Sequence, residues 1–300
     1  MIIVSHWSAP WTVLVPMAVV AVLHGRGLAA MGLGDRRRGL RPRDRRRRQQ
    51  AVLFWGGLAA LVVALASPLD YWSAIDFWPH MLQHLVLVYV AAPLVVLGAP
   101  WLALIRGLPA RPRRAFLRFF YRQPVGSGIR TSLRVLAQPV VATVGFLVLF
   151  LTWHLPVLFD ATLHNQVIHD FEHLCFFGGG MWLWSQLVGS YPSQPRWEPV
   201  TRVWLIAGVL FVNWMLAIAM AFARNPWYPA YGQVRVPHMG LLADQSLAAA
   251  CMWVLPMIPL GIATFRCLNV WLARDGDDDA RLQVMIAQTR AAMLRTKSQP

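Results

Sequence analysis

Long apolar stretches separated by short polar segments dominate the chain. Each stretch approaches the roughly 20 apolar residues that an α-helix needs to cross a bilayer. Seven are present, at about 9–30, 51–67, 79–98, 136–155, 167–189, 200–223 and 243–272. The predicted fold class is therefore all-α, a polytopic membrane helix bundle with seven transmembrane helices. The first residues carry no positive charge and no small-residue cleavage site, so no cleavable signal peptide is expected.

Composition and charge fit this fold class, and the distribution of charge predicts the orientation of the chain in the membrane. Only 14% of residues are charged, against about 25% in soluble domains. The polar segments and adjoining helix ends lie alternately on the two sides of the membrane. On one side they hold 26 basic and 7 acidic residues, and on the other side 2 basic and 6 acidic residues. The positive-inside rule makes the first side cytoplasmic, with the N-terminus extracytoplasmic and the C-terminus cytoplasmic. The net charge of +15 then reflects topology and contact with anionic lipid at the cytoplasmic face, and no nucleic-acid partner is predicted.

The chain is predicted to hold one transmembrane domain, residues 1–273, and a cytoplasmic tail, residues 274–300. Within the domain, the basic cytoplasmic loop 99–135 interleaves phenylalanines with arginines. Stretches of this kind tend to lie in the headgroup plane of a membrane. The tail has the pattern of a solvated helix.

Histidines gather on the side that is poor in basic residues, which holds eight of the nine. Two pairs at i, i+4 spacing begin the third and fifth stretches, and one histidine ends the fourth. This spacing places both imidazoles of a pair on one face of a helix. Ionisable groups at membrane depth are costly and usually face a functional cavity, and neutral imidazole is the form that binds metals. The predicted ligands of one shared metal site are His80, His84, His154, His169 and His173. Glu172 and Asp244 are expected to orient these imidazoles by hydrogen bonding.

Histidines alone leave the identity of the metal open, and the neighbouring side chains make copper the expected one. Imidazole alone suits zinc, copper, iron or nickel, whereas thioether and thiolate neighbours favour Cu(I). Met81 adjoins His80, Cys175 lies two residues after His173, and Cys251 and His238 lie on the same side of the membrane, so these four are further candidate ligands. The alternative for isolated histidines, such as His6, His164 and His238, is a polar role at the membrane interface. Three cysteines do not form a disulfide framework, and no catalytic constellation is present, so no enzyme activity is predicted.

Three segments carry a resemblance to a known family. They are SPLDYWSAIDFWPHMLQHLVLVYVAAPLVVLGAP (67–100), TWHLPVLFDATLHNQVIHDFEHLCFF (152–177) and ADQSLAAACMW (243–253). This sequence is similar to the CtaG-type cytochrome c oxidase assembly factors of bacteria over about 51–273. By motif, the resemblance covers both histidine pairs, His154, Glu172 and Asp244, whereas Ser246 replaces the usual second glutamine. It implies a multi-pass protein of the bacterial plasma membrane that supplies copper to the oxidase.

The predicted function is thus to hold copper, as Cu(I), at the extracytoplasmic face and to pass it to cytochrome c oxidase subunit I, with a periplasmic copper donor as a further partner. One alternative is a membrane cytochrome that ligates haem through His84 and His173. A small-solute or metal transporter and a ligand-free scaffold are the others. The almost wholly apolar run 85–98 argues against a transport path through the bilayer.

Overall fold

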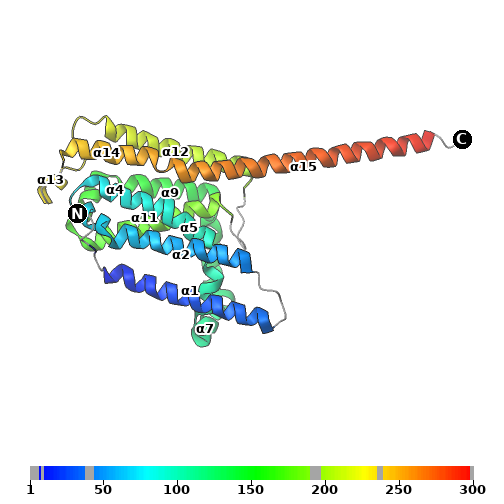
Figure 1. Ribbon diagram of the computed structural model, residues 1–300, viewed down its shortest axis with the longest axis horizontal. Helices are drawn as coiled ribbons and strands as arrows, with labels where there is room; N and C mark the ends of the chain where they lie inside the picture. Colours follow the sequence, from blue (N-terminus) through cyan, green and yellow to red (C-terminus); the bar gives the residue numbers. More distant parts are fainter. Residues whose placement is uncertain (1–6, 8–9, 38–43, 190–196, 235–238, 298–300) are drawn as a thin grey trace.

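The computed structural model describes residues 7, 10–37, 44–189, 197–234 and 239–297, and within these ranges every regular element is helical. Long helices run side by side in a bundle, and the last extends beyond it (Figure 1). The elements are α1 (Trp11–Arg37), α2 (Asp44–Ala66), α3 (Pro68–Ser73), α4 (Phe77–Val86), the π-helical turn η1 (Leu87–Ala91), α5 (Ala92–Gly98), α6 (Trp101–Gly107), α7 (Ala110–Arg122), α8 (Pro124–Leu136), α9 (Pro139–Trp153), α10 (Pro156–His164), α11 (Gln166–Leu187), α12 (Pro199–Ala221), α13 (Tyr231–Val234), α14 (Leu241–Val254) and α15 (Met257–Lys297).

Five helical segments are long and apolar enough to cross a membrane. They are Trp11–Gly34, Arg45–Ala66, Phe77–Gly98, Pro199–Ala221 and Leu241–Gly276. The all-α membrane class is therefore confirmed in its coarse form, a multi-pass helical protein.

The other two expected spans coincide with α9 and α11. Helix α9 alone has only 15 residues, but together with α8, from which it is bent by 80°, it is long and apolar enough to be a sixth, broken span. Helix α11 does not meet the same criterion. Helix α11 has 22 residues, and its apolarity is lowered by four titratable side chains in its first two turns. It nevertheless packs inside the bundle against α5, η1 and α9. A count of seven spans remains a prediction.

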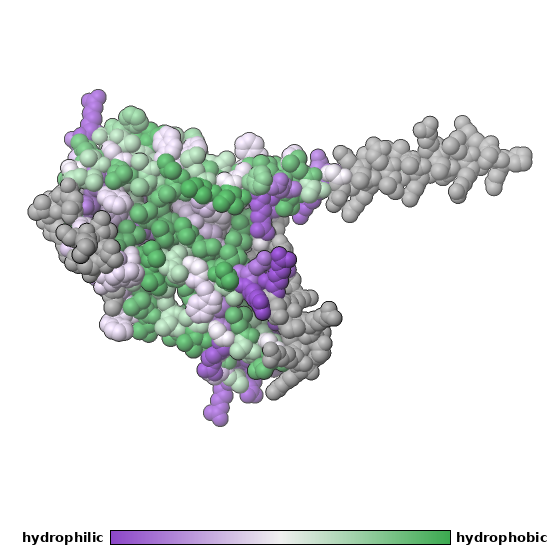
Figure 2. Space-filling model, viewed as in Figure 1, coloured by the Kyte–Doolittle hydropathy of each residue, from purple (hydrophilic) through white to green (hydrophobic). Residues whose placement is uncertain are grey.

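The outer surface of the bundle is apolar. On α1, Val15, Val19 and Val22 are each more than half exposed, and Trp204 and Phe211 are likewise exposed on α12. Figure 2 shows an apolar belt across the middle of the visible face, with hydrophilic residues toward its edges. Soluble monomers rarely expose apolar surface on this scale, so lipid is the natural neighbour of these faces.

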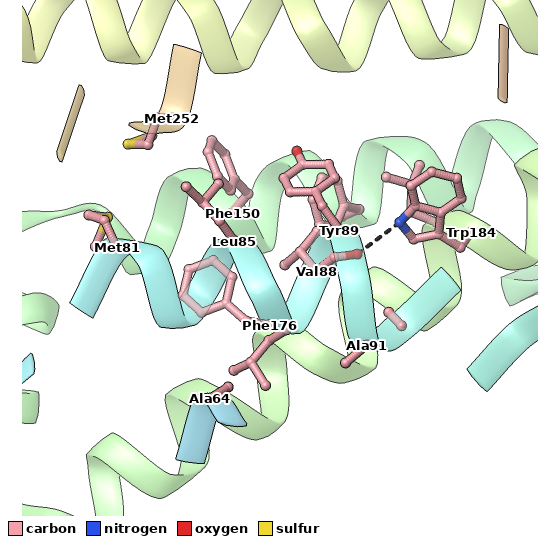
Figure 3. Close-up of a cluster of buried hydrophobic side chains, with 14 of the residues drawn as sticks. Ala64, Met81, Leu85, Val88, Tyr89, Ala91, Phe150, Phe176, Trp184 and Met252 are labelled. Atoms are coloured by element: carbon pink, nitrogen blue, oxygen red, sulfur yellow. Dashed lines mark hydrogen bonds between the residues drawn. The ribbon is translucent and has the colours of Figure 1, made fainter. Parts of the chain in front are cut away.

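The continuous helix α4–η1–α5 forms the centre of the core. In η1 the amide of Ala92 donates to the carbonyl of Leu87, five residues back. With the same five-residue spacing, the carbonyl of Val88 would accept from the amide of residue 93, but Pro93 has no N–H to donate. The indole Nε1 of Trp184 on α11 donates to the Val88 carbonyl instead, at 2.8 Å (Figure 3). Because a buried unpaired carbonyl is costly, this bond ties α11 to the helix that carries the first histidine pair.

The two ends of the bundle differ in character. The end where α4 and α11 begin is called here the histidine end, and the end where α5 finishes and α6–α8 follow is the arginine end (Figure 1). No residue of α7 is buried. Helix α15 runs without a break through the expected boundary between residues 273 and 274.

Candidate metal centre

Local interactions fix the starts of the two histidine-bearing helices. Both carboxylate oxygens of Asp244 accept backbone hydrogen bonds at the start of α4, from Phe77 N at 2.7 Å and from Trp78 N at 2.8 Å. At the start of α11 the side chain of Asn165 accepts from the backbone of residue 167 at 2.9 Å. Side-chain acceptors of this kind satisfy amides that have no partner within a helix. Asp244 thus acts on the backbone of α4, and through it on the imidazoles that follow.

The two helices bring four of the predicted histidines together. The side chains of His80, His84 and His173 are buried, Glu172 is fully buried, and His169 is half-buried. The ligand atoms of His80, His84 and His173 all lie within 4.8 Å of one another. The same holds for a second set, made of His80, His169 and Glu172. The two sets share His80, so the cluster offers more ligands than one ion needs.

The tightest part of the cluster is a triangle of three atoms. His80 Nε2 lies 3.0 Å from His84 Nε2 and 3.3 Å from Glu172 Oε2, and the third side, His84 Nε2 to Glu172 Oε2, is 3.6 Å. A point equidistant from these atoms lies about 1.9 Å from each, close to the 2.0–2.2 Å at which imidazole nitrogen and carboxylate oxygen bind a small transition-metal ion. The triangle therefore matches the size of such an ion with little rearrangement.

Several buried polar atoms of the cluster lack a hydrogen-bond partner among the described residues. They are His84 Nδ1, His173 Nε2 and Glu172 Oε1. Buried polar atoms are nearly always paired in folded proteins. An ion bound at the triangle would use His84 Nε2 and leave His84 Nδ1 to another partner, whereas His173 Nε2 and Glu172 Oε1 are available to it.

Tyr231, which sequence reasoning missed, sets the orientation of His80. Its hydroxyl lies 2.9 Å from His80 Nδ1 and donates to the Ser73 carbonyl at 3.2 Å. Burial, and next the Glu172 carboxylate, raise the pKa of Tyr231 well above its usual range, so the hydroxyl keeps its proton. When this proton is donated to Ser73, the hydroxyl oxygen can accept from His80 Nδ1–H, and this tautomer leaves the lone pair of His80 Nε2 facing the cluster. Only its place between the last two expected spans, on the histidine side, could have pointed to Tyr231.

His154 lies beside the cluster but in neither ligand set. Its Nδ1 is 2.7 Å from the carbonyl of Phe150. The ring of Phe176 stacks on His84 with centroids 4.1 Å apart and meets His154 edge-on at 6.0 Å. An aromatic ring therefore contacts both imidazoles, and a ligand role for His154 stays a prediction.

The other candidate residues lie elsewhere. The half-buried thiols Cys175 and Cys251 belong to neither ligand set, and Met81 is buried among apolar side chains of the core. His164 is exposed, as expected for an interfacial residue. His6 and His238 lie outside the described residues.

The fold and this site define a multi-pass helical membrane protein with a buried cluster of histidines and one carboxylate. The family model described as cytochrome c oxidase caa3 assembly factor (Caa3_CtaG) matches residues 29–274. The chain belongs to this family, which confirms the family resemblance found in the sequence.

Relatives extend the comparison without adding a function. Uncharacterized protein Mb0105 of Mycobacterium bovis is 26% identical over 230 residues, which are 75% of this chain and 34% of that protein. Uncharacterized protein ML1998 of Mycobacterium leprae is 24% identical over 232 residues, with the same coverage of both chains. The chain thus spans about a third of the length of these relatives. No solved structure matches it.

Proposed function

We propose that this chain is a copper carrier for oxidase assembly, which holds Cu(I) on His80, His84, His169, His173 and Glu172. The observation that carries the proposal is the triangle of His80, His84 and Glu172, sized for one ion and buried inside a membrane bundle. Imidazole is a good ligand for copper. Membership of an oxidase assembly family makes the oxidase the natural recipient, and we assign transfer to its subunit I.

Charge supports a monovalent ion. Glu172 is the one carboxylate in the two ligand sets, and it is fully buried. A carboxylate and Cu(I) together are neutral, whereas a divalent ion would leave a net positive charge in a medium of low dielectric constant. An uncompensated buried charge is strongly destabilising. Charge balance therefore supports Cu(I), whereas a ligand set of imidazoles and one carboxylate does not by itself distinguish Cu(I) from Zn(II).

The overlap of the two ligand sets suits release of the ion. An ion held by His80, His84 and His173 can exchange ligands toward His169 while keeping His80. Since His169 is the half-buried member, this exchange moves the cargo toward the surface. The process needs no bond-making chemistry beyond ligand exchange, so the protein acts as a carrier rather than an enzyme.

The orientation that fits this role has seven spans in the bacterial plasma membrane, with the histidine end outside and the arginine end in the cytoplasm. It is supported by the charge asymmetry of the sequence and by the positions of α4 and α7 toward opposite ends of the bundle (Figure 1). A periplasmic donor would then have access to the copper site.

Haem ligation by His84 and His173 is less compatible with the geometry. Their ring centroids are 5.4 Å apart, and the ring of His80 is 4.4 Å from His84 and 5.9 Å from His173. Phe176 stacks directly on His84. A haem macrocycle must lie between its two axial imidazoles, and the rings of His80 and Phe176 occupy the space beside His84 that it would need.

Metal analysis of the purified full chain tests the proposal. The wild type, loaded anaerobically with Cu(I) and desalted, is expected to retain about one copper per chain, and the His80→Ala/His84→Ala variant almost none. His164→Ala, an exposed histidine at the same end, is the matched control and should retain copper fully. Equal copper in the wild type and the double variant would reject these ligands, and a Soret band in protein purified from cells would favour haem.

A further inference from the structure

The arginine end carries a helical hairpin that the copper proposal does not use. Helices α7 and α8 pack against each other, and only Gly126 of their residues is buried. A Cβ at Gly126 would lie 2.2 Å from the carbonyl oxygen of Phe119, so glycine is needed where the two helices meet. The hairpin is thus a defined unit that projects from the core.

The orientation of the hairpin follows from the bend between α8 and α9. These helices meet at 80°. If α9 runs along the bundle, across the membrane, α8 lies close to the membrane plane. Loop 99–135, which contains the hairpin, has eight arginines and no acidic residue. A surface with this charge and orientation faces the headgroups of a bilayer.

Both helices gather most of their apolar and basic side chains on different faces, although Arg113 shares the face of Phe116 and Phe120 on α7. On α8, one stripe holds Val125, Ile129, Leu133 and Leu136, all exposed. Arg134 lies away from this stripe, and Arg130 is turned to α7, where its guanidinium lies over the rings of Phe120 and Tyr121. These positions follow from 3.6 residues per turn. Exposed apolar stripes on an amphipathic helix bury about 5–10 Å into the boundary between headgroups and acyl chains. The stripe on α8 therefore has lipid rather than protein as its fitting neighbour.

Helix α7 adds a row of cations. Arg111, Arg114, Arg118 and Arg122 share one face of the helix, and with Tyr121 they line a surface recess of about 970 Å³. Phe116 and Phe120 lie on the opposite face, with their rings stacked at 5.8 Å. Guanidinium groups bind phosphate oxygens in bidentate geometry. The row is thus suited to several phosphates in one plane rather than to a single small ion.

We infer that the α7–α8 hairpin is a binding site for anionic phospholipid, with headgroup phosphates on the arginine row of α7 and acyl chains against the apolar stripe of α8. The site would lie in the cytoplasmic leaflet and would help to fix the bundle in the membrane. It is independent of copper, because none of its residues belongs to the metal cluster.

Hydrogen exchange of the full chain in nanodiscs tests this inference. In phosphatidylglycerol discs the amides of residues 110–136 are expected to exchange roughly tenfold more slowly than in phosphatidylcholine discs. The difference should largely disappear at about 1 M salt, where the Debye length is about 3 Å. Exchange in α4 and α11 serves as the internal reference and should be the same in both lipids.

Two variants with the same charge change locate the effect. Arg111→Gln/Arg114→Gln/Arg118→Gln should abolish the protection by phosphatidylglycerol, and Arg281→Gln/Arg290→Gln/Arg295→Gln in α15 should retain it. Ile129→Ser/Leu133→Ser should weaken protection without changing charge. Equal exchange in both lipids, or equal loss in the two arginine variants, would overturn the inference. So would the same protection from inorganic phosphate in phosphatidylcholine discs, or protection only when an oxidase subunit is added.

Discussion

The metal cluster and the α7–α8 hairpin both place ionisable side chains at helical spacing, but they differ in burial. In the cluster, His80, His84 and Glu172 are at most 4% exposed, and two of their polar atoms, His84 Nδ1 and Glu172 Oε1, lack a partner among the described residues. In the hairpin, Tyr121 is 64% exposed, and the arginine row is open to solvent or headgroups. Buried polar groups that converge are suited to the proposed ion site, whereas exposed cations beside an apolar stripe are suited to a membrane surface.

Among the variants that distinguish the metal cluster from the hairpin, Glu172→Gln is expected to have the largest effect, on the affinity for Cu(I). Loss of the carboxylate removes the charge that balances Cu(I), so the affinity for Cu(I) should fall by roughly 10- to 100-fold. Competition with a chromophoric Cu(I) chelator measures this. Asp170→Asn is the matched control, because Asp170 lies on the same helix, bonds to Gln166 at 2.8 Å and belongs to neither ligand set. Equal losses in both variants would show that Glu172 has no special role.

A smaller effect is expected from Tyr231→Phe. The substitution removes the acceptor of His80 Nδ1–H, so His80 Nε2 is no longer fixed toward the cluster. The affinity for Cu(I) should fall by about tenfold, while the helical content stays unchanged. The exposed Tyr121, at the arginine end, provides the control Tyr121→Phe. Unchanged affinity in Tyr231→Phe would mean that the tautomer of His80 is set by other contacts.

The effect of Trp184→Phe should appear in stability. Without the indole N–H, the buried carbonyl of Val88 loses its donor, and the free energy of unfolding should fall by about 1–3 kcal/mol. Denaturation of the purified protein in mixed micelles measures the change. Trp204→Phe, at a position 74% exposed on α12, should have little effect. A comparable fall in both variants would indicate a general sensitivity to loss of tryptophan.

The smallest effects are expected when a variant of one region is measured by the property of the other region. Arg111→Gln/Arg114→Gln/Arg118→Gln should leave copper stoichiometry within error of the wild type, because the hairpin shares no residue with the cluster. His80→Ala/His84→Ala should in turn leave the lipid-dependent exchange of residues 110–136 unchanged. A change of copper stoichiometry in the arginine variant, or of lipid-dependent exchange in the histidine variant, would show that the two ends are coupled.

The periodic features of both regions could be predicted from the sequence alone. Spacing of four residues placed His80 with His84 and His169 with His173 on shared faces, and the structure brings the two pairs together. Arginines interleaved with phenylalanines likewise indicated a surface segment within residues 99–135. No residue of α7 is buried, whereas α6, in the same segment, packs against α1. These predictions succeed because helical periodicity is a local property of the chain.

Features that depend on tertiary contacts could not be predicted in this way. Tyr231 reaches His80 from the start of the short helix α13, 151 residues away, and no periodic pattern marks such a contact. Glu172 was expected to orient the imidazoles, but its Oε2 lies in the ligand triangle itself. The hydrogen bond from Trp184 to the Val88 carbonyl likewise depends on how α11 packs against η1.

The central claim is that histidines from α4 and α11 bind one copper ion together, and X-ray absorption at the copper K-edge tests it most directly. The purified, Cu(I)-loaded chain is predicted to show two or more imidazole nitrogens at about 2.0 Å from the metal, with an edge typical of Cu(I). Loss of this imidazole shell in the His80→Ala/His84→Ala variant is the matching result. A shell of sulfur ligands alone, or an imidazole shell unchanged in that variant, would contradict the claim.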